Sequence, residues 1–244
     1  MSDTLVVNEV YLSLQGESTF AGLPCVFVRL TACNLRCSYC DTAYAFTEGS
    51  PREIQEIIAD VQKFAERFGL QPGAGRLPLV ELTGGEPLLQ RNSLRLMRDL
   101  CELGFTVLVE TSGALDISAV DPRVRRIMDL KCPSSGESTR NRLENIQHLK
   151  GTDEVKFVIG TREDYAWAKE MLAQHNLSRI CPVLFSWVSP LKPEQQHPAL
   201  KAVPADHQPI TRLELVESII ADALPVRFQL QMHKFIWQPE QRGV

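Results

Sequence analysis

A run of eight residues, Cys33-Asn34-Leu35-Arg36-Cys37-Ser38-Tyr39-Cys40, carries three cysteines with the spacing C-x3-C-x2-C. A structural zinc site takes four ligands, and an ordinary four-iron cluster takes four thiolates. Three thiolates on one compact loop can hold three irons of a cubane and leave the fourth iron open to a second molecule. The spacing therefore indicates a [4Fe–4S] cluster with an open iron at which a bound molecule can react.

Two other uses of these cysteines have to be weighed. A zinc site needs a fourth ligand, and the sixty residues that follow Cys40 contain neither Cys nor His. Upstream, Cys25 lies in an apolar run, where a small buried thiol is the commoner outcome. A disulfide is disfavoured because the chain has seven cysteines and opens with no signal-peptide pattern. We therefore expect a reducing, cytoplasmic setting.

Length and composition indicate a globular enzyme. The chain has 244 residues, of which 44% are hydrophobic and 23% charged, as in ordinary globular proteins. We expect one domain over residues 1–244. The formal net charge of -4 argues against a nucleic-acid partner, which calls for a basic face. No apolar stretch is long enough for a membrane span, so we expect no membrane partner either.

Apolar strand-like runs alternate with amphipathic helical runs along the chain. We expect strands at residues 24–30, 77–82, 105–110, 125–130, 154–159, 180–185 and 226–232. Such alternation predicts a parallel sheet with right-handed crossovers. Because this is too few units for an eight-stranded barrel, we expect an α/β fold. It would be an incomplete parallel β/α barrel of about six to seven strands, with its chemistry at the carboxyl ends of the strands.

The helical runs carry their own signals. We expect helices at residues 50–69, 93–103, 141–149, 163–175 and 212–224. The first is expected to begin at Ser50, with Pro51 at its first position and Glu53 completing a capping box. The last is expected to bury one apolar face, made of Leu213, Val216, Ile219, Ile220 and Ala223.

A glycine-rich run follows the second predicted strand of this barrel. It reads Thr83-Gly84-Gly85-Glu86-Pro87. The two glycines let a backbone edge approach a ligand closely, and Glu86 can accept a hydrogen bond from an amine. Taken alone, the run is explained equally well by a turn.

Other polar residues are open to two interpretations. Arg29 lies on an apolar strand, where a buried guanidinium needs a substrate carboxylate or a carboxylate of the protein. Gln15 and Glu17 flank a glycine on a tight turn, for which a surface hairpin is the simpler interpretation. Lys131 and His233 follow strands. A solvated charge at the rim also explains Lys131, and a structural histidine is the simpler interpretation of His233.

In combination these motifs resemble the radical S-adenosylmethionine (radical SAM) superfamily and, within it, the 7-carboxy-7-deazaguanine synthases of queuosine biosynthesis. The resemblance spans nearly the whole chain. It rests on the runs Ser13-Leu14-Gln15-Gly16-Glu17, Phe27-Val28-Arg29-Leu30, Cys40-Asp41-Thr42, Thr83-Gly84-Gly85-Glu86-Pro87, Glu110-Thr111-Ser112-Gly113 and Gln231-Met232-His233-Lys234. Many radical SAM enzymes share the cysteine loop and Gly-Gly-Glu-Pro, whereas the combination is specific.

The resemblance implies a role for each matching residue. It implies that the [4Fe–4S] cluster is bound by Cys33, Cys37 and Cys40. It implies that S-adenosylmethionine is bound by Tyr39, Cys40, Asp41, Gly85, Asp129, Leu130, Lys131 and Ser186. It implies that the substrate is bound by Leu14, Gln15, Gly16, Arg29 and Thr83. Thr42 matches a threonine that contacts Mg²⁺, a hard cation that substrate oxygens and water also ligate.

The implied reaction converts 6-carboxy-5,6,7,8-tetrahydropterin into 7-carboxy-7-deazaguanine with loss of ammonia, which is a carbon–nitrogen lyase activity. The resemblance also implies a flavodoxin or ferredoxin as electron donor and a homodimeric assembly. Two features depart from the family pattern. Ser18 follows Glu17 where a glycine is more usual, and residues 235–244 continue past the point where some relatives end.

Two rival functions share parts of this pattern. A radical SAM activase of a glycyl-radical enzyme has the cysteine loop and Gly-Gly-Glu-Pro, but has no need of Gln15 and Arg29 beside a carboxylated pterin. A non-enzymatic metal-binding module would hold one zinc rather than a cluster of about four irons and four sulfides. Metal and sulfide analysis separates these two classes.

Overall fold

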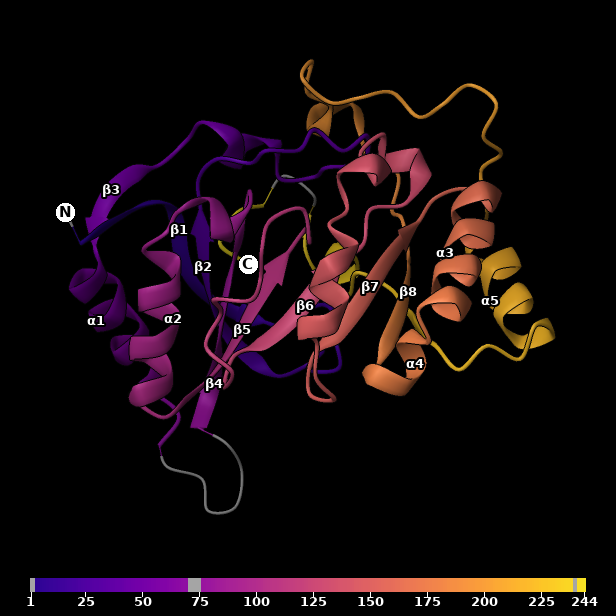
Figure 1. Ribbon diagram of the computed structural model, residues 1–244. Coiled ribbons are helices and arrows are strands. Elements are labelled where there is room, and N and C mark those ends of the chain that lie inside the picture. Colours follow the sequence, from indigo (N-terminus) through magenta and orange to yellow (C-terminus); the bar gives the residue numbers. More distant parts are fainter. Residues whose placement is uncertain (1–2, 70–75, 239–240) are drawn as a thin grey trace.

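The computed structural model describes residues 3–69, 76–238 and 241–244, and its strands join in one sheet (Figure 1). The strands are β1 (Thr4–Leu14), β2 (Pro24–Leu30), β3 (Ser50–Glu53), β4 (Arg76–Gly84), β5 (Phe105–Thr111), β6 (Arg125–Asp129), β7 (Glu154–Ile159), β8 (Val183–Trp187) and β9 (Arg227–Gln229). Their order is β3-β1-β2-β4-β5-β6-β7-β8-β9. From β2 to β9 all neighbours are parallel, which confirms the expected α/β partial barrel.

The helices lie along the outside of this sheet. Helices α1 (Ile54–Ala65) and α2 (Ser93–Glu102) cover one part, and α3 (Arg162–Gln174), α4 (Leu177–Ile180) and α5 (Arg212–Ala221) cover another (Figure 1). A short helix, α6 (His233–Ile236), follows β9. The helix predicted at residues 141–149 is a 3₁₀ segment, Leu143–His148, because the β6–β7 connection is made of short turns.

Two N-terminal strands were missed by the sequence patterns. β1 pairs antiparallel with β2, and β3 pairs antiparallel with β1. The predicted helix start at Ser50 is therefore wrong, because the backbone of β3 finds a strand partner in β1. Helix α1 begins after Glu53, whose backbone N–H donates to the side chain of Glu56 at 3.2 Å. Near the other end, β8 begins three residues later than predicted and β9 is shorter.

Successive strand residues point to opposite faces of the sheet, and each face has its own core. The outer face packs against the helices. The inner face carries a separate apolar group, which we name the barrel floor: Cys25, Phe27, Leu79, Leu108 and Ile127. On β4, β5 and β6 the floor residue is followed, two positions further on, by Glu81, Glu110 and Asp129. The alternation therefore places a ring of charged side chains directly above an apolar floor.

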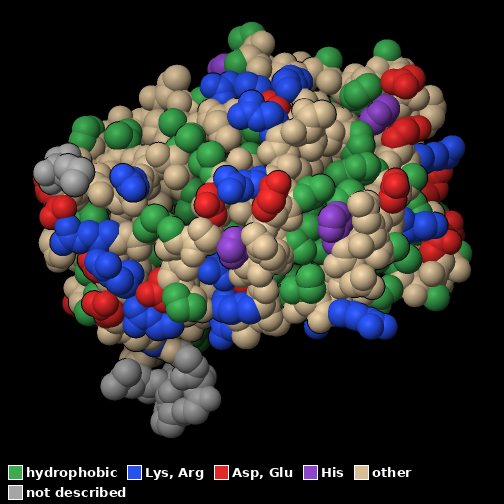
Figure 2. Space-filling model, in the orientation of Figure 1, with side chains coloured by type: hydrophobic (Ala, Val, Ile, Leu, Met, Phe, Trp, Pro, Cys, Tyr) green, Lys and Arg blue, Asp and Glu red, His purple; other side chains and the backbone are tan. Residues whose placement is uncertain are grey.

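Charges of both signs occur on the surface. Lys and Arg side chains are interspersed with Asp and Glu on the face shown in Figure 2. In the part of the chain that the structure describes, no helix is both long and apolar enough to cross a bilayer.

Helix α5 buries a different face from the one that its sequence predicts. Leu213 is 66% exposed and Ile220 is 72% exposed, although both were assigned to the buried face. Leu215 is completely buried instead. Ile219, which the sequence assigned to the buried face, is buried as well. Because α5 lies at the outer end of the layer of helices (Figure 1), only a narrow stripe of it is covered.

This difference predicts opposite effects for two leucines on the same helix. Leu215→Ala is expected to lower the free energy of unfolding by about 2–5 kcal/mol, because it opens a cavity in the outer core. Leu213→Ala, the matched control, is expected to change it by less than about 0.5 kcal/mol. Urea denaturation followed by circular dichroism measures both. A larger loss for Leu213→Ala would show that the sequence-predicted face is the buried one.

Candidate active site

A cavity of about 560 Å³ opens at the carboxyl ends of the parallel strands. Most of the predicted site residues line it, namely Leu14, Gln15, Gly16, Arg29, Cys33, Cys37, Tyr39, Cys40, Asp41, Thr42, Thr83, Gly85, Asp129 and Lys131. Leu130 does not, because it belongs to the outer core. Ser186 is buried on β8, outside the lining residues. The cavity thus brings together residues that lie far apart in the sequence.

The cysteine loop is fastened to the end of β4 by backbone contacts. The N–H of Gly85 donates to the carbonyl of Leu30 at 3.0 Å, and the N–H of Glu86 donates to the carbonyl of Ala32 at 2.8 Å. A Cβ on Gly85 would overlap the Ala32 carbonyl. Ala32 itself has a φ of 78°, in the left-handed region, where the chain turns into the loop. Gly85 is therefore needed for the close approach of two backbone segments.

The far side of the loop is fastened to the turn that follows β6. The N–H of Ser38 donates to the carbonyl of Ser135 at 3.1 Å, and its hydroxyl donates to the carbonyl of Ser134 at 2.7 Å. The N–H of Arg36 donates to the Glu137 carboxylate at 2.7 Å. The loop is therefore held between two neighbouring regions of the sheet edge.

The three thiols of the loop are free and suited to a cluster rather than to one ion. None of the three forms a disulfide, and burial raises the pKa of each, that of Cys37 to about 12. Among the described residues, no three His, Cys, Asp or Glu side chains are arranged around a single metal ion. A cubane fits this arrangement, because each thiolate then holds a different iron.

Unpartnered polar atoms surround the space beside the loop. The hydroxyls of Tyr39 and Ser186 and one carboxylate oxygen of Asp129 are buried, with no hydrogen-bond partner among the described residues. The other Asp129 oxygen accepts from the Lys131 ammonium at 2.7 Å. Buried polar atoms are nearly always satisfied. A ligand that carries amino, carboxylate and hydroxyl groups, as S-adenosylmethionine does, fits these atoms.

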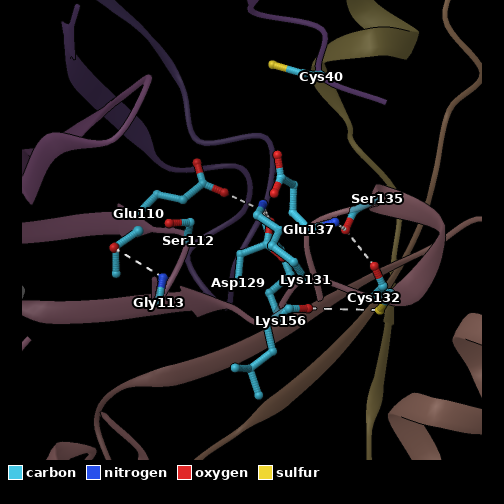
Figure 3. Close-up of polar contacts among 12 residues, drawn as sticks. Cys40, Glu110, Ser112, Gly113, Asp129, Lys131, Cys132, Ser135, Glu137 and Lys156 are labelled. Carbon is cyan, nitrogen blue, oxygen red and sulfur yellow. Dashed lines mark hydrogen bonds and ion pairs between the residues drawn. The ribbon is translucent and has the colours of Figure 1, made fainter. Parts of the chain in front are cut away.

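Two lysines and two carboxylates form one connected group of ion pairs: Lys131 and Lys156 both lie within 4.0 Å of Asp129, and Lys156 also pairs with Glu110. Figure 3 shows Glu110, Asp129, Lys131 and Lys156 gathered below Cys40. Burial acts to lower the pKa of Lys131, but Asp129, Cys37 and Glu110 together outweigh burial and raise it well above its usual range. The ammonium groups therefore stay charged beside the cysteine loop.

Glu86 is a structural residue, which contradicts the role that its motif suggested. It is fully buried and accepts hydrogen bonds from the Thr111 hydroxyl at 2.9 Å and from the Ser112 hydroxyl at 2.6 Å. The backbone N–H groups of Ser112 and Leu88 donate to it as well. With both oxygens filled, Glu86 has no capacity left for the amine of a ligand. It joins the end of β5 to the end of β4.

Arg29 has a fixed partner within the protein and a free donor. Its Nε donates to Glu9 at 2.7 Å and its Nη2 to the Tyr11 hydroxyl at 2.8 Å. The Tyr44 hydroxyl also donates to Glu9, at 3.2 Å. No described residue accepts from Nη1, and Arg29 lines the cavity. The guanidinium is thus oriented by protein contacts and presents its third nitrogen to a ligand.

A chain of charged and amide side chains covers the barrel floor. Gln15 donates to the Glu81 carboxylate. Lys156 forms ion pairs with Glu110 and, at 3.0 Å, with Glu17. The Thr83 hydroxyl donates to Glu110 at 3.2 Å. The contacts connect two of the predicted substrate-binding positions, Gln15 and Thr83, to side chains of the inner face.

Glu9, Glu81 and Lys156 are site residues that sequence reasoning missed. Each lies within a strand rather than after it, where the search for motifs did not look. For Glu81 and Lys156 a signal was present, because a charged residue inside a strand that is otherwise buried needs a partner or a function.

The C-terminal segment closes one side of the cavity. The N–H of Met232 donates to the carbonyl of Gly16 at 3.0 Å, and a Cβ on Gly16 would collide with His233. Lys234 pairs with Asp41 at 2.6 Å. Burial acts to raise the pKa of Asp41, but the Lys234 ammonium outweighs it and holds the pKa well below its usual range. The predicted substrate segment and the cysteine loop are both fixed by this segment.

Comparison with known proteins agrees with this geometry. Residues 28–172 match the family described as the radical SAM superfamily. A 7-carboxy-7-deazaguanine synthase of Koribacter versatilis is 45% identical over 240 residues, which cover 98% of this chain and 99% of the relative. A 7-carboxy-7-deazaguanine synthase of Chlorobaculum tepidum is 40% identical, covering 98% of this chain and 97% of the relative.

The fold is also similar to that of a solved structure. The crystal structure of QueE from Escherichia coli superimposes with a TM-score of 0.67, at 22% identity, and covers 94% of this chain and 95% of that one. The likeness supports the partial barrel as the architecture of this chain.

The contact of Gly85 with Ala32 predicts the effect of adding one methyl group. Gly85→Ala is expected to displace the cysteine loop, because the overlapping atom is backbone and cannot rotate away. Iron bound after anaerobic reconstitution, about four per chain in the unchanged protein, is expected to fall well below that value. In the matched control, Gly151→Ala, the nearest atom is 3.7 Å away and iron binding is expected to persist. Full iron binding by Gly85→Ala would contradict this account of the loop.

Proposed function

The chain belongs to the radical SAM superfamily and, within it, to the 7-carboxy-7-deazaguanine synthases, and we propose that it converts 6-carboxy-5,6,7,8-tetrahydropterin into 7-carboxy-7-deazaguanine and ammonia in queuosine biosynthesis. The observation that carries this proposal is the cavity itself. It combines three free thiols with an oriented arginine whose third nitrogen is free. The three thiols suit a cluster that starts radical chemistry, and the arginine suits a substrate that carries a carboxylate.

The residues beside the cysteine loop would hold the cofactors. We assign the [4Fe–4S] cluster to Cys33, Cys37 and Cys40. We assign S-adenosylmethionine to the predicted residues that line the cavity, namely Tyr39, Cys40, Asp41, Gly85, Asp129 and Lys131. When bound, the cluster and S-adenosylmethionine together supply the one-electron chemistry that removes hydrogen from the substrate. The protein holds the reacting groups in place and limits the access of water.

The opposite side of the cavity would hold the pterin. Nη1 of Arg29 is free to donate to the substrate carboxylate, while Glu9 and Tyr11 keep the guanidinium in position. Gln15 and Thr83 present an amide and a hydroxyl beside it, and Leu14 and Gly16 supply the neighbouring backbone. Thr42 lies between the cysteine loop and this region, with its hydroxyl 3.8 Å from the Cys40 sulfur. We assign Mg²⁺ to Thr42, with substrate oxygens and water as further ligands.

The remaining partners follow from the chemistry proposed. A reduced cluster needs a one-electron donor, for which a flavodoxin or a ferredoxin is suited. A homodimer and a cytoplasmic, reducing location complete the proposal. The activase alternative is disfavoured because the relatives that match almost the full chain are synthases.

Turnover of the reconstituted protein tests the proposal. Anaerobically reconstituted protein, supplied with S-adenosylmethionine, Mg²⁺, dithionite and 6-carboxytetrahydropterin, is expected to form 7-carboxy-7-deazaguanine and ammonia in equal amounts. Liquid chromatography with mass spectrometry measures the acid, and an enzymatic assay measures ammonia. Reductive cleavage of S-adenosylmethionine without formation of the acid would contradict the synthase function and favour the activase.

Arg29→Lys tests the assignment of the substrate carboxylate. Lysine retains the charge but cannot contact Glu9, Tyr11 and a carboxylate with a planar fork. Loss of one charge-assisted hydrogen bond is expected to raise KM for the pterin about 10- to 100-fold. Arg98→Lys, on the exposed side of α2, is the matched control and is expected to leave KM unchanged. An unchanged KM for Arg29→Lys would place the carboxylate elsewhere.

A further inference from the structure

Glu81 lies at the bottom of the cavity and, among the described residues, has no lysine or arginine within ion-pair distance. Its side chain comes from the inner face of β4, next to the barrel floor, and the residue is only 3% exposed. Lys156 lies within 4.0 Å of Glu17, Glu110 and Asp129, but not of Glu81. Across the described residues, no other lysine or arginine forms an ion pair with Glu81. A buried carboxylate without a cation is costly when ionised.

The hydrogen bonds of Glu81 leave one of its oxygens open. Gln15 donates its amide N–H to Oε2. In the described part of the chain, no group is hydrogen-bonded to Oε1. A neutral carboxyl group suits this arrangement, because its carbonyl oxygen accepts from Gln15 and its hydroxyl remains free to donate into the cavity.

The groups that face Glu81 from the neighbouring elements favour its protonated form. Burial and the Glu110 carboxylate on β5 raise the pKa of Glu81 well above its usual range, and Glu17 acts in the same direction. Lys156 on β7 and the hydrogen bond from Gln15 oppose this rise without cancelling it. The remaining neighbours are Cys25 on β2 and Tyr11 on β1, both neutral at pH 7 because burial raises their own pKa values.

Glu17 occupies the opposite state in the same cavity. Burial acts to raise its pKa, but Lys156, His233 and the Gln231 side chain together outweigh burial and lower it to about 2. Gln15 contacts both residues, since its Oε1 accepts from the backbone N–H of Glu17 at 3.1 Å and its Nε2 donates to the Glu81 carboxyl group. Two carboxyl groups with opposite protonation states in one site are the usual arrangement of an acid and a base.

We propose that Glu81 is the general acid that protonates the nitrogen leaving as ammonia, an inference that rests on the proposed function. In this step the carbon–nitrogen bond breaks and its electron pair remains on nitrogen. The Glu81 O–H bond breaks as a new N–H bond forms. Because the substrate differs from the product by one ammonia only, a ring carbon gives up one proton for the one that nitrogen gains. The ionised Glu17 is the base that accepts this proton, and exchange with water restores both groups.

The variant Glu81→Gln distinguishes two roles of Glu81: donating a proton, and only holding Gln15 in position. Glutamine has the same shape and can still accept from Gln15, but it cannot supply the proton. We expect kcat for ammonia release to fall about 100-fold or more, with KM for the pterin changed less than about threefold. Glu81→Asp retains a carboxyl group and is expected to recover part of kcat. Glu154→Gln is the matched control, since Glu154 is a buried carboxyl group outside the cavity whose partner is Thr19.

The pH profile gives a second readout of the acid. Its pKa is raised in the folded protein, so the acid is present at low pH and is lost as pH rises through that value. The alkaline limb of kcat is therefore expected to be present in the unchanged enzyme and absent from the residual activity of Glu81→Gln. A wild-type kcat for Glu81→Gln would overturn the proposal, because an acceptor for Gln15 would then be sufficient.

Infrared spectroscopy reads the proton without any turnover. The unchanged protein, without substrate, is expected to show a protonated-carboxyl band at neutral pH that is missing from Glu81→Gln and still present in Glu154→Gln. Absence of such a difference would show that Glu81 is ionised and would overturn the inference even if the enzyme is active. Failure of the unchanged enzyme to form product would instead contradict the proposed function, and the two failures are therefore distinguishable.

Discussion

The close approach of Gly85 to the backbone of Ala32 is the contact on which the active site depends. It joins the end of β4 to the start of the cysteine loop, so the thiols occupy a fixed position relative to the other strand ends. Hydrogen bonds from Ser38 to the turn after β6 fix the far side of the loop. A flexible loop would carry the same three cysteines, but it would not hold a cluster at a defined distance from the substrate.

The alternation of strand residues sets the polarity of the cavity. On the inner face, the apolar residues of the barrel floor are followed two positions later by Glu81, Glu110 and Asp129. These charged groups therefore lie on an apolar layer that excludes water. Lys156 neutralises several carboxylates of this ring but does not reach Glu81. The surroundings of these carboxyl groups therefore differ, because burial and neighbouring carboxylates raise the pKa of Glu81 whereas Lys156 helps to lower that of Glu17.

Much of the fold and part of the site could be predicted from the sequence. The parallel strands follow from apolar runs, and the cysteine loop and Arg29 are visible as local exceptions to their surroundings. The strand pairing of β1 with β3 was not predictable, because it depends on contacts far apart along the chain. The exposed face of α5 and the structural role of Glu86 also depend on neighbours that only the folded chain supplies. Glu81 and Lys156 were overlooked because they lie within strands.

We propose that three thiolates hold a cluster whose remaining iron is open to S-adenosylmethionine. Mössbauer spectroscopy of protein reconstituted with ⁵⁷Fe, before and after addition of S-adenosylmethionine, tests this arrangement. A single iron site is expected to change its isomer shift and quadrupole splitting while the other irons of the cluster keep theirs. A spectrum that is unchanged by S-adenosylmethionine, or a preparation that binds zinc in place of iron, would contradict it.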